Sequence, residues 1–398
     1  MNLVSDRVTN MAESATLAMA AKAREYKAQG IEVIGLSLGE PDFKTPKHIQ
    51  QGAKAAIDEQ KYFAYPPVNG YADVRQAISD KFKRDNGLDY SADQIVISNG
   101  AKQSIANIMM ALLNEGDEVI VFSPFWVSYT ALIKLAGGTP VFIKAGIESD
   151  FKVTPEQLEA AITDRTKAVI YSSPCNPTGS VFTKDELEAL SKVILKHEGV
   201  MVIADEIYEL INYTGTHASM GAIEGMLERT VTVNGMAKGF AMTGWRVGYI
   251  GAPLWLAKAC NKIQGQFTSA NCGIAQRAAL TALTSDLGPS HEMAEEYLRR
   301  RGLVKELLDS IPGFKTNLPT GAFYFFPDVS AYFGKSHGDT VINNASDLCM
   351  YLLDNAHVSL VTGEAFGDPN CVRLSYAASE EDLREAIRRI KIALSNLA

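Results

Sequence analysis

Seven short apolar runs, separated by helix-type segments, constrain the fold of this chain more than any other feature. In chain order they cover residues 94–98, 118–122, 139–143, 167–172, 200–204, 229–233 and 247–251. Apolar strands that alternate with helices indicate a mostly parallel sheet with helices on both faces. The sequence therefore predicts an α/β fold, and ligand-binding residues are expected directly after the strands, at the carboxyl edge of the sheet.

Two further regions flank this alternating pattern. Residues 13–29 have the pattern of an amphipathic helix, and from about residue 286 the alternation gives way to helices and short strands. A chain of 398 residues exceeds the roughly 250–300 residues that a single core usually supports. We therefore expect a large domain formed by residues 46–285. A smaller α+β domain is expected from both ends of the chain, residues 1–45 and 286–398.

Composition argues against several classes of protein. The formal net charge of -8 disfavours a nucleic-acid binder, which normally presents a basic face. The five cysteines are scattered without metal-ligand spacing, so we expect free thiols in a reducing compartment and no metal site. The first residues, MNLVSDRVTN, lack the apolar core of a signal peptide, and no stretch reaches the roughly 18 apolar residues of a membrane span. We expect a cytoplasmic protein that binds neither membranes nor nucleic acids.

Lys238 is the residue with the most specific chemistry. It follows the sixth apolar run and the turn signal Asn234-Gly235, and burial there would favour a neutral amine able to attack an aldehyde. A solvated loop lysine is the commoner explanation for such a residue taken alone. Eight positions later, Arg246 offers a guanidinium that suits a phosphate group. Together the two residues suggest pyridoxal phosphate.

Other polar residues also follow apolar runs. Gly100 and Ala101 open a helix whose N-H groups and dipole suit an anion, although an N-cap turn is the commoner explanation. Asp205 ends the fifth run, where a buried carboxylate needs a positive partner: a protonated pyridine nitrogen, a metal ion or an ordinary ion pair. Asn176 lies in a rigid polar loop after the fourth run. Arg373 lies in an alternating strand, and its sequence context is compatible with two roles: binding a substrate carboxylate or forming a surface ion pair.

Seven motifs in one order extend over almost the whole chain. They are SLGEPDF, NGAKQ, SPFWVSY, NPTG, ADEIY, NGMAKGFAMTGWRVGY and VRLSYA. This set resembles the class I aminotransferases of fold type I, and most closely the bacterial aspartate aminotransferases of the gamma subgroup. The resemblance implies a pyridoxal-phosphate-dependent transferase fold whose large domain contains a mostly parallel seven-stranded sheet. One departure is that Gly235 and Ala237 stand where other subgroups often carry hydroxyl groups that contact the phosphate.

The resemblance also implies roles for the matching residues. Lys238 is expected to form the Schiff base with pyridoxal 5'-phosphate and to transfer the proton. Asp205 is expected to pair with the pyridine nitrogen, Tyr208 and Asn176 to contact the ring oxygen, and Trp126 to stack on the ring. The residues expected to hold the cofactor phosphate are Gly100, Ala101, Lys102 and Arg246.

Substrate contacts and a subunit interface follow from the same resemblance. The residues expected to bind substrate are Gly39, Trp126, Asn176 and Arg373, with Lys102 and Thr16 serving dicarboxylates and prephenate. Tyr65 matches a tyrosine that this family sends into the phosphate site of the neighbouring subunit, which implies a homodimer with shared active sites. The peptide bonds before Pro124 and Pro177 match positions that are cis in relatives.

The expected reaction is a ping-pong transfer of the amino group from L-aspartate to 2-oxoglutarate through a Lys238 imine, with prephenate or aromatic keto acids as further substrates. The main alternative is another enzyme of this fold type: an aromatic or alanine aminotransferase, or a C-S β-lyase. We do not expect an aminotransferase-like sensor domain, which would need an attached DNA-binding domain. A nicotinamide dehydrogenase is also disfavoured, because no GxGxxG motif follows the first run.

Overall fold

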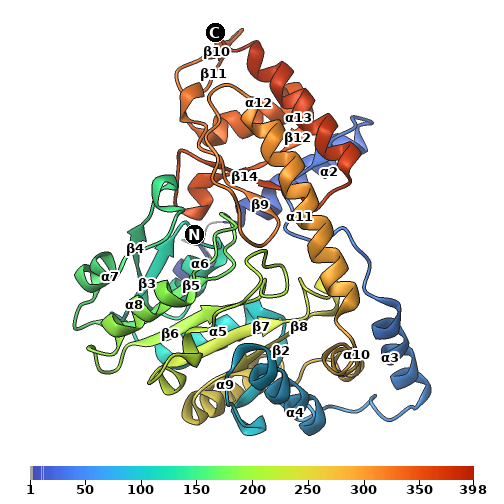
Figure 1. The fold of residues 1–398 in the computed structure, drawn as a ribbon, viewed down its shortest axis with the longest axis vertical. Helices are drawn as coiled ribbons and strands as arrows, with labels where there is room; N and C mark the ends of the chain where they lie inside the picture. Colours follow the sequence, from blue (N-terminus) through green and yellow to red (C-terminus); the bar gives the residue numbers. More distant parts are fainter. Residues whose placement is uncertain (1–2, 10, 12) are drawn as a thin grey trace.

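A seven-stranded sheet forms the centre of the protein in the computed structural model, which describes residues 3–9, 11 and 13–398 (Figure 1). In chain order its strands are β2 (Ile95–Asn99), β3 (Glu118–Ser123), β4 (Thr139–Lys144), β5 (Thr166–Ser172), β6 (Met201–Asp205), β7 (Thr230–Gly235) and β8 (Val247–Gly251). Their spatial order is β2-β8-β7-β6-β5-β3-β4. All pairings are parallel except those of β8, which is antiparallel to both neighbours. The predicted mostly parallel seven-stranded sheet is confirmed.

Both faces of this sheet are covered because successive residues of a strand point to opposite sides. In β3, Val119 and Val121 join one buried cluster, whereas Ile120 joins another. The helices of this part of the chain are α3 (Lys47–Asp58), α4 (Ala72–Lys81), α5 (Ala101–Leu112), α6 (Ser128–Leu135), α7 (Pro155–Ala161), α8 (Lys184–Ile194), α9 (Leu254–Phe267) and α10 (Gly273–Thr284). Continuous apolar strands are stable here because helices remove both of their faces from water.

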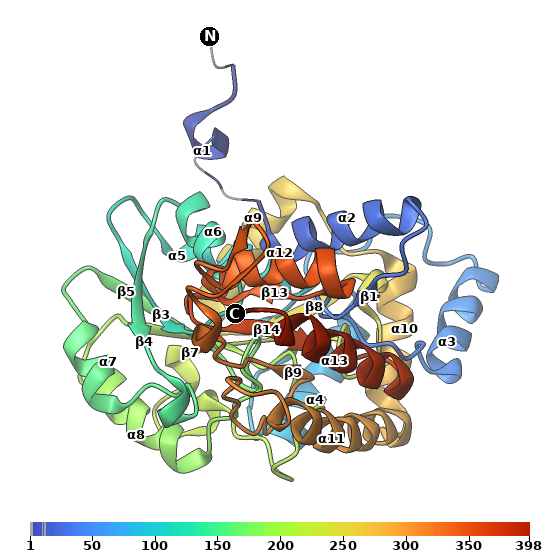
Figure 2. The ribbon, with the colours of Figure 1, turned by 90° about the horizontal axis from the view of Figure 1, so that it is seen from above.

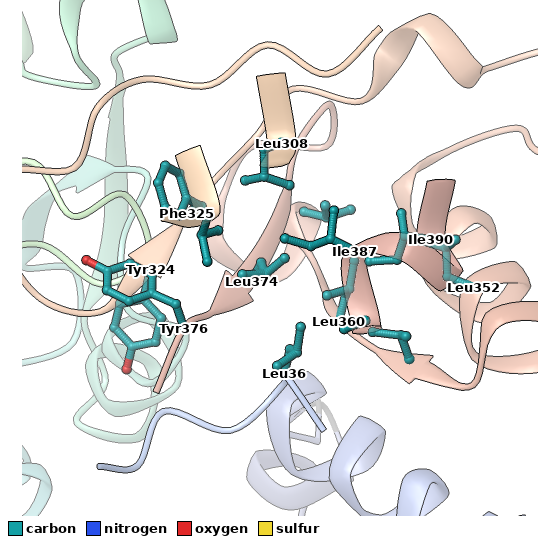
Figure 3. Packing of buried hydrophobic residues seen from close by; sticks show 14 of the residues in the cluster. Leu36, Leu308, Tyr324, Phe325, Leu352, Leu360, Leu374, Tyr376, Ile387 and Ile390 are labelled. Carbon is teal, nitrogen blue, oxygen red and sulfur yellow. The ribbon is translucent and has the colours of Figure 1, made fainter. Parts of the chain in front are cut away.

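The two ends of the chain meet in a second core, above the sheet in Figure 1. Its helices are α2 (Ala15–Ala28), α11 (Gly288–Asp309), α12 (Ala345–Ala356) and α13 (Glu380–Ser395). Its short strands are β1 (Ile34–Gly35), β9 (Tyr324–Phe325), β10 (Ser336–His337), β11 (Thr340–Val341), β12 (Val358–Ser359), β13 (Val361–Thr362) and β14 (Val372–Ser375). Strand β1 pairs in parallel with β12, and Leu36 packs in the same cluster as Leu360, Leu374 and Ile387 (Figure 3). The domain boundaries stated above stay a prediction.

Two details of the backbone differ from expectation. The bond between Ser123 and Pro124 is cis as predicted, but the second cis bond precedes Pro174, so the prediction for Pro177 is wrong. Pro174 and Pro177 both lie in the loop after β5. Because the cis form costs little before any proline, the sequence does not show which of these two bonds is cis. The residue pattern also predicts a single helix over residues 72–86, but α4 ends at Lys81 and a π-helical turn covers Phe82–Asn86.

The N-terminal helix α1 (Asp6–Thr9) lies apart from the rest of the chain (Figure 2). This arrangement leaves large apolar side chains near the N-terminus in solvent, among them Leu3 and Val8. None of the helices in the described residues combines the length and the apolar character that crossing a bilayer requires.

Candidate active site

A cavity of about 360 Å³ lies where the carboxyl edge of the central sheet faces strand β14. Of the residues predicted from the sequence, those that line it are Thr16, Gly39, Ala101, Lys102, Trp126, Asn176, Asp205, Tyr208, Lys238, Arg246 and Arg373. Gly100 directly precedes this lining at the start of α5. Tyr65 lies outside it, with 94% of its surface exposed. The topology therefore gathers at one cavity residues that are more than 350 positions apart in the chain.

Lys238 lies just past the end of β7, and its Nζ atom donates a hydrogen bond to the carbonyl of Gly39. The nearest rings are those of Tyr208 and Phe323, whose centroids are 5.7 and 5.9 Å from Nζ. Among the described residues, no carboxylate forms a salt bridge with this amine. Burial lowers its pKa to about 8, against a smaller opposing effect of Glu40. A sizeable neutral fraction near neutral pH makes Lys238 both a nucleophile and a base.

Asp205 is buried at the end of β6 and has two hydrogen-bond donors. Its Oδ2 atom accepts from the hydroxyl of Tyr129 at 2.6 Å, and its Oδ1 atom accepts from the backbone N-H of Ile207 at 3.3 Å. Burial raises the pKa of this carboxyl group to about 6, while the Tyr129 hydroxyl opposes the rise. A buried carboxylate without a cation bonded to it suits the protonated ring nitrogen of a ligand.

The start of α5 forms the phosphate side of the cavity. The first N-H groups of a helix lack intrahelical acceptors, so those of Ala101 and Lys102 are available to an anion. Gly100 has φ 86°, and a Cβ atom there would overlap the Nη2 atom of Arg246. The Arg246 guanidinium donates to two carbonyls, of Thr243 at 2.8 Å and Asn99 at 3.2 Å. Glycine thus allows a guanidinium and a helix start to converge on one anion.

Arg373 supplies a second positive group and is 1% exposed. Its Nη1 atom donates to Oδ1 of Asn176 at 2.9 Å and its Nη2 atom to the carbonyl of Ser37 at 2.5 Å. Its Nε atom has no hydrogen-bond partner among the described residues. Both neighbouring groups are neutral, so the surface ion pair considered above is wrong for Arg373. A buried guanidinium that lacks an anion suits a ligand carboxylate.

Tyr324 also lines the cavity, beside Arg373 and Tyr208. Its hydroxyl lies 2.6 Å from that of Tyr208, and its ring centroid lies 4.7 Å from the Arg373 guanidinium. A Cβ atom at Gly39 would overlap this same hydroxyl, which explains the need for glycine there. Sequence reasoning missed Tyr324, because GAFYFFP indicates only a buried strand.

Tyr129 was also missed. It lies in α6, which begins two residues after Trp126, and its backbone N-H donates to the carbonyl of Trp126 at 3.0 Å. The rings of the two residues meet edge to face, with centroids 5.5 Å apart. Phe125, by contrast, is buried in the core of the large sheet.

The entrance of the cavity carries Lys102 and Thr16. The Lys102 Nζ atom lies 5.0 Å from the centroid of the Trp126 ring, and burial together with Arg246 lowers the pKa of this lysine. The Thr16 Oγ1 atom is buried and has no hydrogen-bond partner among the described residues. Both side chains therefore retain polar capacity for a ligand.

These features fit pyridoxal phosphate. The aldehyde would meet the amine of Lys238, the ring nitrogen would meet the buried acid Asp205, and the phosphate would meet Arg246 and the start of α5. The unpartnered Nε atom of Arg373 remains for a carboxylate of the substrate.

Comparisons with known proteins point in the same direction. The family model described as aminotransferase class I and II matches residues 31–390. A bifunctional aspartate aminotransferase and glutamate/aspartate-prephenate aminotransferase of Petunia hybrida is 45% identical over 98% of this chain and 82% of its own. An aspartate/prephenate aminotransferase of Cereibacter sphaeroides is 45% identical over the full length of both chains.

Solved structures with the same fold cover the chain equally well. The aspartate aminotransferase of Rhizobium meliloti superposes with a TM-score of 0.96 at 40% identity, over all of both chains. That of Thermus thermophilus, determined with maleate, gives a TM-score of 0.93 at 41% identity over 99% of this chain and 100% of its own.

Proposed function

The chain belongs to the class I and II aminotransferases, and from this membership we propose that its cavity transfers the amino group of L-aspartate to 2-oxoglutarate. Pyridoxal phosphate is the cofactor of this family. One observation carries the proposal: the amine of Lys238 and two guanidinium groups line the same cavity as a buried acid, and in the described part of the chain none of the three cations forms a salt bridge with a carboxylate.

Each residue around the cofactor has one task. Pyridoxal phosphate supplies an aldehyde that bonds amines and a ring that withdraws electrons from the substrate. Asp205 would hold the proton on the ring nitrogen of the bound cofactor, and Tyr129 favours the ionised form of Asp205 by donating to its Oδ2 atom. Tyr208 and Asn176 would contact the ring oxygen. Trp126 would pack on the ring face.

Arg373 and Lys238 act on the substrate itself. The Arg373 guanidinium, already oriented by Asn176 and Ser37, binds the α-carboxylate with its free donors. Gly39 leaves room beside it. Lys238 removes the proton from the substrate Cα atom, a step that suits a base with a pKa of about 8. Holding acid and base in one cavity converts a bimolecular step into an intramolecular one.

The distal carboxylate needs a further cation, and Lys102 at the entrance is in the right place to supply it. The Thermus thermophilus structure was determined with maleate, a dicarboxylate, and the Cereibacter sphaeroides relative is named for both aspartate and prephenate. We therefore propose that Lys102 selects dicarboxylates and that the free hydroxyl of Thr16 assists with prephenate. On the same grounds we propose that the chain belongs to the gamma subgroup of aspartate aminotransferases.

A homodimer in the cytoplasm is the assembly that we propose. Tyr65 is almost fully exposed outside the cavity of its own chain, which suits a side chain that completes the phosphate site of a partner subunit. Further large apolar side chains exposed in the single chain are Leu17, Phe63, Trp255 and Phe267. Burying such surface is the usual reason for association.

The test is a half-reaction with a panel of amino donors. Aspartate alone, without a keto acid, should convert the bound cofactor once to the pyridoxamine form, as followed by its visible absorbance. A C-S β-lyase would instead release ammonia and turn over continuously. Faster conversion by alanine or tyrosine than by aspartate would overturn the assigned donor. Lys102→Ala should slow aspartate and leave alanine unchanged, which tests the role of Lys102 separately.

A further inference from the structure

A network of buried polar side chains lies behind Asp205, outside the cavity, and the proposed reaction assigns it no role. Its members are Lys81 of α4, Asn86 of the following π-helical turn, Glu206 and Glu209 after β6, and His217 and Ser219 in the next loop. Glu206 is 1% exposed and Lys81 4%. Charged groups at this depth are rare unless they are paired, so the arrangement needs an explanation.

Hydrogen bonds join all six side chains. Asn86 donates its side-chain amide to Glu206 at 3.1 Å and to Glu209 at 2.8 Å. Lys81 forms an ion pair with Glu209 and donates to Oδ1, the side-chain amide oxygen of Asn86, at 2.6 Å. The Oε2 atom of Glu206 also accepts from the Ser219 hydroxyl at 2.7 Å and lies 2.9 Å from the Nε2 atom of His217.

The network holds the segment that carries two of the proposed active-site residues. Asp205 and Tyr208 line the cavity, while Glu206 and Glu209 enter the network from the same turn. The backbone of this turn is tied by N-H donation from Glu206 to Val233 at 2.9 Å. A shift of either glutamate therefore moves Asp205 or Tyr208 relative to the cofactor.

Charge balance in the network depends on His217. Two carboxylates face one ammonium, that of Lys81, and among the described residues the remaining basic group bonded to them is His217. Burial by itself would lower the pKa of His217. The attraction of Glu206 and Glu209 for the protonated ring is stronger than this effect, so the pKa of His217 is raised above its ordinary value. The other titratable groups that interact electrostatically with the two glutamates are Asp205, Arg84, Tyr90, Tyr171 and Tyr249.

We propose that His217 is a positioning residue of the active site: by pairing with Glu206 it fixes the turn at residues 205–209 and so holds Asp205 and Tyr208 in place against the cofactor. This inference rests on the proposed cofactor site. A metal ion is the rival occupant, because donor atoms of Glu206, Glu209 and His217 lie within 4.8 Å of one another. The ammonium of Lys81 and the amide of Asn86 already occupy carboxylate oxygens there, so a divalent ion would have to displace them.

The chain offers a matched control for this proposal. His197 also has its Nε2 atom 2.9 Å from a glutamate, Glu159, but that pair lies at the surface, with 31% and 41% of the side chains exposed. The pair of His217 and Glu206 is 9% and 1% exposed. His217→Gln and His197→Gln therefore remove the same interaction at two depths.

The experiment uses the cofactor-loaded protein and its absorbance. His217→Gln should raise the dissociation constant of pyridoxal phosphate about 10-fold, the lower end of the loss typical for supporting residues of a site. The pH midpoint of the visible absorbance should move upward, because a nearby positive charge has been lost. His197→Gln should change neither quantity. Equal behaviour of the two variants would overturn the proposal.

A double variant separates positioning from general damage. Glu206→Gln combined with His217→Gln removes both charges, so cofactor affinity should return to within about 3-fold of the parent protein. This comparison holds even if His217→Gln alone does not fold, and a double variant that still loses the cofactor overturns the proposal. The proposal would also be overturned if the parent protein retained one zinc ion per chain after dialysis and the His217→Gln variant did not. A protein that binds the cofactor but does not transaminate aspartate would refute only the proposed function.

Discussion

Lys81 and Lys238 are two lysines removed from bulk water whose surroundings differ completely. Lys81 contacts a carboxylate, Glu209, and an amide oxygen, so its charge is balanced. Lys238 contacts a neutral carbonyl and lies near aromatic rings, and burial lowers its pKa to about 8. The first arrangement stabilises the fold. The second keeps an amine uncharged and reactive at some cost in stability.

Two buried arginines repeat this contrast. Arg300 forms ion pairs with Asp42 and Glu296, both at 2.8 Å. Arg373 is bonded to neutral oxygens alone among the described residues, and its Nε atom lacks an acceptor. A buried cation without a carboxylate therefore marks a place for a ligand, whereas a paired cation marks a structural contact. The following predictions test this rule.

The largest effect is expected at Lys238 itself. Lys238→Ala removes the bonding amine and the base together, so transamination of aspartate should fall at least about 10⁴-fold, or roughly 5 kcal/mol at the barrier. Borohydride reduction followed by peptide mass analysis should find the cofactor attached to residue 238 in the parent protein and nowhere in the variant. Residual activity within tenfold of the parent would contradict the assignment, and Lys184→Ala at the surface serves as the control.

The two lysines should affect stability with opposite signs. Lys81→Met leaves the buried carboxylate of Glu209 unpaired and should cost about 3–5 kcal/mol of unfolding free energy. Lys238→Met should stabilise the cofactor-free protein by about 1–3 kcal/mol at pH 7, because the folded-state pKa of Lys238 is about 8 and its ordinary value is 10.5.

Urea unfolding at a series of pH values tests both the predicted loss of stability in Lys81→Met and the predicted gain in Lys238→Met. A depressed lysine pKa makes the folded state bind fewer protons than the unfolded state between pH 8 and 10.5. The penalty is therefore fully present below pH 8 and disappears as the pH rises through 10.5, so the advantage of Lys238→Met should shrink over that window. If both methionine variants destabilise equally at pH 7, the contrast between the lysines is refuted.

Lysine substitutions of Arg373 and Arg300 should separate an effect on substrate binding from an effect on stability. Arg373→Lys loses the two-pronged contact with a carboxylate, so KM for aspartate should rise about 100-fold, roughly 2.7 kcal/mol. Arg300→Lys should lower the free energy of unfolding by about 1–2 kcal/mol and leave KM within about 3-fold. Steady-state kinetics and urea unfolding of both variants decide the point, and a large KM effect at Arg300 would argue against the rule.

The smallest effect is expected at Tyr129. Tyr129→Phe removes the hydroxyl that lowers the pKa of Asp205, so that pKa should rise above about 6 and the acid limb of the activity profile should move to higher pH. Affinity for pyridoxal phosphate should fall about 3- to 10-fold. Tyr171→Phe is the matched control, because the Tyr171 hydroxyl is buried without a hydrogen-bond partner among the described residues. Equal effects of the two changes would contradict the role of Tyr129.

Local pattern was enough to place the strands and the residues that follow them. Each of the seven predicted apolar runs lies within one or two residues of an observed strand, because continuous burial leaves a mark in the sequence itself. Lys238, Asp205 and Asn176 could be singled out because they follow such runs. The roles of Lys102 and Thr16 rested on family resemblance alone, and the tertiary structure places both side chains in the cavity lining.

What the sequence determined by itself is the set of apolar strands, the helices between them and the reactive residues at the strand ends, since all of these depend on neighbours a few positions away. The tertiary structure alone decided that β8 runs antiparallel and that the second cis bond precedes Pro174 and not Pro177. It also decided that Tyr129 meets Asp205 across 76 positions and Tyr208 meets Tyr324 across 116. Such contacts depend on how distant segments pack, and no local pattern records them.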